Sequence, residues 1–113
     1  MKKWKKIAIA CTVIPAGIAL LMAAATEHTV SQKDREFSTK EMTITVGDSV
    51  KFSNDDNIVH DVFSSTPGME FDLKTQQPNN SSTIKFDKEG VCEVRCAIHP
   101  KMKLKITVQK ANP

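Results

Sequence analysis

The sequence predicts an all-β domain, a sandwich of short strands that follows an N-terminal signal or anchor segment. Three observations beyond residue 25 predict this fold. Turn-forming residues recur at short intervals, at 47–48, 54–57, 67–68, 78–80 and 90. Apolar and polar residues alternate in the short runs between them, and no stretch of a dozen residues carries a helical stripe. Short alternating strands joined by regular turns favour an antiparallel sandwich.

The first 25 residues have the pattern of an export segment. Four lysines within residues 1–6 precede the uncharged run 7–25, which ends in Ala23-Ala24-Ala25. This predicts a signal peptide cut after Ala25 and a periplasmic or otherwise exported protein. The run is also long enough for an uncleaved membrane anchor, although Pro15 and Gly17 disfavour a single straight helix. Cys11 follows too few apolar residues for a lipoprotein cysteine.

The basic charge of the chain belongs to this leader. Removing its four lysines from the 16 basic residues leaves 12, against 13 acidic ones, so the remainder has a net charge of −1. Nucleic-acid binding is therefore not expected. After the leader we expect a tether or a first edge strand at residues 26–39, and the folded domain at residues 40–113.

Five alternating runs predict the strands that build the core. In each run the apolar members share one strand face. These faces are Met42, Ile44 and Val46; Val50 and Phe52; Ile84 and Phe86; Cys92, Val94 and Cys96; and Met102, Leu104, Ile106 and Val108.

The segment CEVRCAIHPKM places four soft-metal ligand types close together, at Cys92, Cys96, His99 and Met102. A Cys92–Cys96 disulfide is disfavoured, because four residues of strand span about 13 Å, whereas a disulfide needs Cα atoms within roughly 7 Å. A zinc site of both cysteines, His99 and His60 lacks the usual ligand spacing and gives Met102 no role. A thiolate, two imidazoles and a weak thioether are the ligand set of an electron-transfer copper site.

The second imidazole must come from a distant part of the chain. The segment 57–63 supplies His60, which alternates with Ile58 and Val62 and so faces the core in a predicted strand. A histidine on such a face is usually an ordinary core residue. The Cys-His-Met cluster elsewhere in the chain favours its assignment as a ligand.

Residues 47–63 (GDSVKFSNDDNIVHDVF) and 90–102 (GVCEVRCAIHPKM) resemble the small type 1 blue copper proteins, the cupredoxins of the amicyanin and plastocyanin kind. The resemblance implies a Greek-key sandwich of about eight strands that binds one copper ion per chain through His60, Cys96, His99 and Met102. It also implies a monomeric carrier of single electrons between partners such as a cytochrome or a dehydrogenase, and not an enzyme.

Two positions depart from that family. Asp61 stands where an asparagine commonly braces the ligand loop, and Cys92 stands where an aromatic residue is common. Cys92 leaves open a binuclear site with two thiolates, as in the copper domain of cytochrome oxidase subunit II. The spacing Cys-x3-Cys-x2-His is one residue short for it, and Gly90 is six residues before Cys96 but only two before Cys92. Both observations favour the mononuclear site.

An alternative function is copper carriage or resistance without electron transfer. A leader cut after Ala25 would expose Thr26-Glu27-His28, whose free amine and third-position histidine can chelate copper(II).

Two surfaces are candidates for partner binding. Ile98 and Pro100, with Met69 and Pro67, are candidates for an apolar docking patch beside His99. Lys101, Lys103 and Lys105 form a basic stripe, which we interpret first as a solvated or edge-protecting face and second as a steering surface for an acidic partner.

Overall fold

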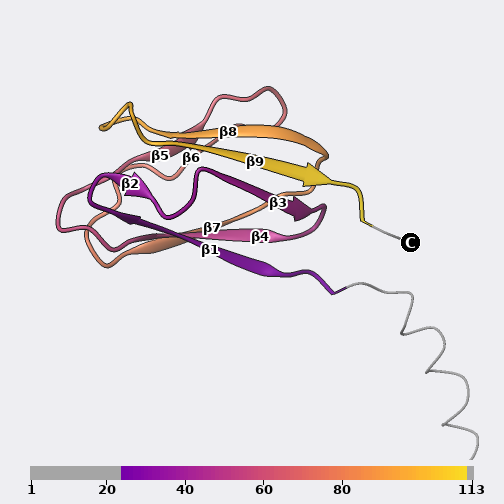
Figure 1. The fold of residues 1–113 in the computed structure, drawn as a ribbon, viewed down its shortest axis with the longest axis horizontal. Helices are drawn as coiled ribbons and strands as arrows, with labels where there is room; N and C mark the ends of the chain where they lie inside the picture. Colours follow the sequence, from indigo (N-terminus) through magenta and orange to yellow (C-terminus); the bar gives the residue numbers. More distant parts are fainter. Residues whose placement is uncertain (1–23, 112–113) are drawn as a thin grey trace, which may run out of the picture.

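The computed structural model describes residues 24–111, and these residues form nine strands and no helix (Figure 1). The strands are β1 (Glu27–Lys33), β2 (Glu36–Phe37), β3 (Glu41–Thr45), β4 (Ser49–Asn54), β5 (Val62–Ser64), β6 (Phe71–Asp72), β7 (Ser81–Lys85), β8 (Gly90–Cys96) and β9 (Lys103–Gln109). The predicted all-β sandwich is confirmed. The leader up to residue 23, with Cys11, lies outside the described residues. Within 24–111 no helix is long and apolar enough to cross a membrane.

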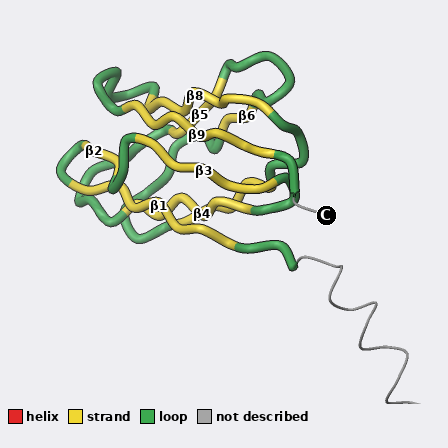
Figure 2. The backbone as a smooth tube through the Cα atoms, turned by 45° about the vertical axis from the view of Figure 1, so that its right-hand side comes forward, coloured by secondary structure: helices red, strands yellow, loops and turns green. Residues whose placement is uncertain are grey.

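The strands form two sheets that pack face to face (Figure 2). One has the order β2-β1-β4-β7 and the other β3-β9-β8-β5-β6. Most strand pairs are antiparallel, as expected, but two are not, because β1 pairs with β4, and β3 with β9, in parallel. Alternation along a strand reports which side chains face the core, but it carries no information on the direction of the neighbouring strand.

Residues 26–39, for which a tether and an edge strand were both open, form β1 and β2. β1 lies between β2 and β4, and its Val30 is fully buried opposite Phe52. A polar sequence is compatible with this position because β1 turns only a few side chains inward. These include Gln32, which is hydrogen-bonded inside the sandwich.

The core lies between the sheets and follows the predicted faces. Its buried apolar members are Val30, Phe37, Ile44, Val50, Phe52, Val62, Phe86, Cys92, Val94, Cys96, Met102, Leu104, Ile106 and Val108. From Val91 to Cys96 in β8, and along β9, buried residues alternate with exposed or half-buried ones. The loop between these two strands therefore extends from an antiparallel hairpin with six paired positions.

Asp48 fixes the turn between β3 and β4 and also the start of β1. Its carboxylate accepts hydrogen bonds from the backbone N–H groups of Thr26 and Thr45 and from Nε2 of His28, at 2.9 to 3.0 Å. Gly47, at φ 99°, gives the turn its left-handed residue. His28 first, and then the two backbone donors, lower the pKa of Asp48 below its ordinary value of 3.8.

This lowered pKa predicts a loss of stability in acid. A carboxyl group whose folded pKa is depressed stabilises the fold above its unfolded pKa, and that contribution disappears as pH falls through the folded pKa. We expect Asp48→Asn to lower the melting temperature by about 5 °C at pH 7 and by progressively less below pH 3.8. Thermal unfolding of both proteins from pH 2 to 7 measures the difference. A difference independent of pH would contradict this role.

Candidate metal centre

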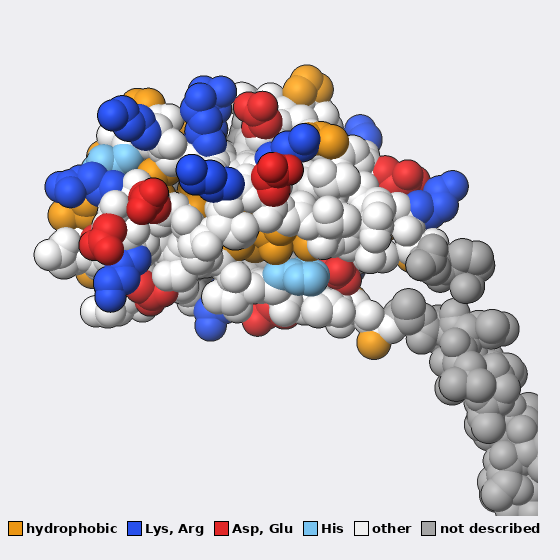
Figure 3. Space-filling model, in the orientation of Figure 1, with side chains coloured by type: hydrophobic (Ala, Val, Ile, Leu, Met, Phe, Trp, Pro, Cys, Tyr) orange, Lys and Arg blue, Asp and Glu red, His pale blue; other side chains and the backbone are white. Residues whose placement is uncertain are grey.

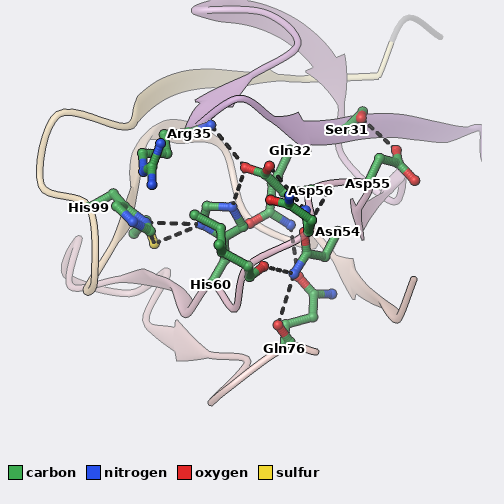
Figure 4. Close-up of polar contacts among 12 residues, drawn as sticks. Ser31, Gln32, Arg35, Asn54, Asp55, Asp56, His60, Gln76 and His99 are labelled. Carbon is green, nitrogen blue, oxygen red and sulfur yellow. Dashed lines mark hydrogen bonds and ion pairs between the residues drawn. The ribbon is translucent and has the colours of Figure 1, made fainter. Parts of the chain in front are cut away.

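Three side chains from two distant segments of the chain, His60 from one and Cys96 and His99 from the other, converge at one end of the sandwich (Figure 4). Sγ of Cys96 lies 3.6 Å from Nδ1 of His60 and 3.9 Å from Nδ1 of His99, and the two Nδ1 atoms are 3.2 Å apart. A triangle with these sides has a point roughly 2 Å from all three atoms, close to the bond lengths of a metal ion to imidazole and thiolate ligands. The residues therefore fit a transition-metal ion without rearrangement.

The hairpin of β8 and β9 positions two of these donors and the predicted fourth. Cys96 is the last residue of β8 and is 1% exposed. His99 follows in the loop, and its carbonyl accepts a 2.9 Å hydrogen bond from the N–H of Met102, which closes a tight turn. Met102 is 2% exposed, with its side chain on the core side of the hairpin. Short loop segments thus bring Cys96, His99 and Met102 to one end of the sandwich, with little loop-closure entropy to lose.

His60 comes from the β4–β5 connection, and here the predicted strand 57–63 was too long. β5 begins only at Val62, and Ile58 lies in a bend. His60 instead forms an isolated bridge with Gln76, in which the two residues exchange backbone hydrogen bonds at 3.2 and 2.7 Å. His60 is fully buried, as the sequence predicted. This bridge and the loop before it hold the backbone of His60 in place.

Asn54 builds that loop and is a residue that sequence reasoning missed. Its amide donates to the carbonyls of Ile58 and Gln76 at 2.8 and 2.9 Å, and its oxygen accepts from the N–H of Asp56 at 2.9 Å. Asn54 is fully buried, so this single amide satisfies three backbone groups.

Asp56 orients the His60 ring and was also missed. Its Oδ2 lies 3.0 Å from Nε2 of His60 and accepts a 2.9 Å hydrogen bond from the N–H of Arg35. The N–H of Arg35, and to a lesser extent His60, lower the pKa of Asp56 to about 2. An ionised carboxylate only accepts, so Nε2 of His60 carries the proton and Nδ1 presents its lone pair to Cys96 and His99. The only signal in the sequence was an aspartate four residues before the histidine.

His99 differs from His60 in its access to solvent. His99 is half-buried, and its neighbours Ala97, Ile98 and Pro100 are exposed, with Ile98 at 44%. Burial is the largest cause that lowers the pKa of His99 below 6.5, and the positive charge of Arg35 acts in the same direction. Its ring therefore favours the neutral form that binds metal.

The backbone of Asp61 contacts Sγ of Cys96. Its backbone N–H donates to Sγ of Cys96 at 3.4 Å, and its carbonyl accepts from the N–H of Ala97 at 2.8 Å. Its side-chain Oδ1 is buried without a hydrogen-bond partner, and burial followed by the neighbouring Asp72 raises the pKa of Asp61. The backbone of Asp61 thus braces the end of β8, whereas burial disfavours the ionised form of its side chain.

Cys92 and Cys96 are both free thiols, as expected, and they lie in different surroundings. Sγ of Cys92 donates to Oγ of Ser64 at 3.2 Å and approaches the carbonyl of Met69 at 3.9 Å. Cys92 is not a member of the cluster formed by His60, Cys96 and His99. Burial raises the pKa of the Cys92 thiol, which keeps it protonated among core residues.

Comparison with known proteins identifies the fold and its chemistry. The model of a family described as copper binding proteins, plastocyanin/azurin family, matches residues 24–109. Amicyanin-alpha of Methylorubrum extorquens is 34% identical over 77 residues, which cover 66% of this chain and 65% of that protein. The chain thus spans about two thirds of this relative's length.

Solved structures agree with the fold. A purple cupredoxin from Nitrosopumilus maritimus matches with a TM-score of 0.65 at 22% identity, over 73% of this chain and 99% of that one. A reduced amicyanin variant matches with a TM-score of 0.68 at 22% identity, over 79% and 88%. The copper-containing nitrite reductase of Thermus scotoductus matches with a TM-score of 0.72 at 26% identity, over 83% of this chain but only 27% of that protein.

Proposed function

Because the chain belongs to the plastocyanin/azurin family of copper-binding proteins, we propose that it is an exported, monomeric carrier of single electrons that holds one copper ion. His60, Cys96, His99 and Met102 are the proposed ligands. The observation that carries the proposal is the convergence of one thiol and two imidazole nitrogens at the end of a rigid sandwich. When bound, copper supplies a one-electron couple between Cu(II) and Cu(I).

The residues around the site have distinct roles in this function. Cys96 provides the thiolate, with the N–H of Asp61 directed at its sulfur. Asp56 and the bridge to Gln76 keep His60 in one orientation, so that the donor positions change little during electron transfer. Met102 is the candidate for a weak axial ligand that tunes the reduction potential.

His99 is the proposed exit for the electron. It is the one nitrogen donor of the three-residue cluster that reaches the surface, whereas His60 is fully buried. Ile98 and Pro100 surround it with exposed apolar surface. Met69, considered for the same patch, lies beside Gly90 at the opposite end of β8 and packs against the core. The docking patch is therefore assigned to the loop residues alone.

A copper titration tests the proposal. We expect the metal-free chain to bind one Cu(II), to develop an intense visible thiolate-to-copper band, and to lose and regain the band through repeated reduction and oxidation. Two coppers per chain with a mixed-valence EPR signal would indicate the binuclear alternative. Copper bound without a thiolate band would favour a copper carrier and contradict electron transfer.

We further propose that the redox partner docks through an acidic surface. Lys101, Lys103 and Lys105 are solvated, as expected, but they do not protect a sheet edge, because β9 is flanked by β3 and β8. Their exposed side chains join Lys40 and Arg95 along a groove on the outer face of this sheet. Basic side chains gather over the end of the sandwich that carries the β8–β9 loop (Figure 3). Glu41 and Glu93 are the acidic residues that line the groove, which leaves it with excess positive charge.

This surface predicts charge-dependent electron transfer. We expect reduced protein to be oxidised faster by the anion ferricyanide at low salt, with the rate falling as salt rises. The double variant Lys101→Glu/Lys103→Glu should slow this reaction about tenfold at low salt and accelerate oxidation by a tris(phenanthroline)cobalt(III) cation. Stopped-flow kinetics measure both rates.

Lys88→Glu/Lys110→Glu is the matched control, because it changes the net charge equally and both lysines are exposed, one before β8 and the other after β9, away from the β8–β9 loop. Equal rates for the double variant and this control would show that the groove does not steer charged reactants.

A further inference from the structure

The surroundings of Asp48 suggest a second use for the turn between β3 and β4. Oδ1 of Asp48 accepts the N–H of Thr26 at 2.9 Å, whereas Oδ2 accepts His28 and Thr45. The Asp48 side chain is only 9% exposed. A nearly buried carboxylate thus contacts the backbone nitrogen of the residue that would follow the predicted cleavage site.

Regular structure begins directly after the Thr26 nitrogen. Ala24, Ala25 and Thr26 are exposed and have no regular structure, whereas β1 begins at Glu27, which pairs with Ser49 of β4. The exposed residues border a shallow hollow that Asp48 and Lys85 also line. The Ala25–Thr26 bond is therefore accessible to a peptidase, and the paired strand beyond it is protected.

We propose that hydrolysis of the Ala25–Thr26 bond by a signal peptidase creates an α-ammonium group on Thr26 that forms an ion pair with Asp48. Water adds across the peptide bond, leaving a carboxylate on Ala25 and an amine on Thr26, which takes up a proton. This inference takes the export of the protein from the proposed function, whereas the contact between Thr26 and Asp48 does not depend on copper binding. The ion pair joins the start of β1 to the β3–β4 turn in the mature protein.

The charges near this position favour the ion pair. An ammonium group at the Thr26 nitrogen places a full positive charge 2.9 Å from Oδ1, where the uncut chain offers only a neutral N–H. His28 shares the carboxylate through the other oxygen. Lys85, the other basic residue lining the hollow, lies 3.7 Å from Asp87, which offsets part of its charge. Asp48 is thus the carboxylate that the new charge meets.

The same geometry opposes the copper(II) chelate considered for Thr26-Glu27-His28. Such a chelate needs the amine, the following amide nitrogens and the His28 ring to converge on one ion. In the structure His28 is directed at Asp48, and Glu27 and His28 pair with Ser49 and Val50. The carbonyl of Thr26 also accepts the N–H of Ser49 at 3.0 Å. The chelate would have to detach the first residues of β1.

Two chains that differ by one residue isolate the ion pair. One begins at Thr26, and the other retains Ala25, so that its ammonium group is displaced and an amide N–H faces Asp48. Both contain the whole core, whose buried members lie between Val30 and Val108. At pH 6 we expect the Thr26 chain to melt about 5 °C higher.

The difference should depend on pH. An amine whose folded pKa is raised by a carboxylate stabilises the fold fully below its unfolded pKa of about 7.7, and this contribution is lost as pH rises through the folded pKa. The advantage should therefore vanish in alkaline solution, and it should be absent when both chains carry Asp48→Asn. Equal melting temperatures at pH 6, or an advantage that survives at high pH, would overturn the ion pair.

The cleavage site is tested on the full chain. Exported from bacterial cells, it should yield a mature protein whose intact mass begins at Thr26; any other terminus, or an uncut chain, would overturn the assigned bond. Copper(II) added to the Thr26 chain carrying Cys96→Ser should not lower its melting temperature, whereas tight binding with loss of stability would favour the chelate. The thiolate band of the unmodified Thr26 chain reports the copper function separately.

Discussion

Replacing Cys96 by serine is expected to abolish the visible thiolate-to-copper band completely. Sγ of Cys96 is the sulfur that lies 3.6 and 3.9 Å from the two imidazole nitrogens. A serine hydroxyl has nearly the same size, but it stays protonated at neutral pH and is a poor ligand for copper. We expect the affinity for copper to fall by at least a hundredfold. Absorption, EPR and competition with a chelator measure both effects.

Cys92→Ser is the matched control on the same strand. Cys92 is equally buried, but its sulfur contacts Ser64 and lies outside the three-residue cluster. The band, its position and the stoichiometry of one copper should survive, with only a modest loss of stability from placing a second hydroxyl beside Oγ of Ser64. A band that requires both cysteines would contradict the mononuclear site and favour the binuclear one.

Replacing Asn54 by alanine is expected to cost about 4 kcal/mol of unfolding free energy. The change removes hydrogen bonds to the carbonyls of Ile58 and Gln76 and to the N–H of Asp56, all at 2.8 to 2.9 Å. Each group that remains buried without a partner costs about 1–3 kcal/mol. Because a domain of this size has only about 5–15 kcal/mol of stability, the variant should be marginally folded. Urea unfolding of the metal-free protein measures the loss.

Asn80→Ala provides the comparison for this variant. Asn80 is exposed and contributes its backbone carbonyl, not its side chain, to the contact with Asn54. We expect its stability to change by less than about 0.5 kcal/mol. If Asn54→Ala were no more destabilising than Asn80→Ala, the buried amide would not be what holds the loop before His60.

The same variant should also weaken copper binding, because Asn54 positions the segment that carries His60. The bridge between His60 and Gln76 depends on backbone groups that the Asn54 amide holds in place. Copper added in excess should recover part of the lost stability, since a ligand that binds only the folded state stabilises it by mass action. The thiolate band should then appear at higher copper concentrations than in the unmodified protein.

The sequence alone determined those features that depend on neighbouring residues. The alternation of Cys92, Val94 and Cys96, and of Met102, Leu104 and Ile106, predicted the buried faces of β8 and β9, because side chains on a strand point alternately to opposite sides. The loop with Cys96, His99 and Met102 was also visible, since its donors lie three residues apart. That spacing predicts that Cys96 and His99 share one site, but it does not predict the position of His60.

Only the tertiary structure decided which distant groups meet. That Asp56 fixes the tautomer of His60, that Asn54 holds its loop, and that Thr26 lies against Asp48 are consequences of how the two sheets pack. The same packing made β1 part of a sheet. It also made β9 an inner strand of its sheet, with the lysines exposed on the outer face. Local periodicity records whether a side chain faces inward, whereas strand order and direction arise from contacts between residues far apart in the chain, which no short window of sequence contains.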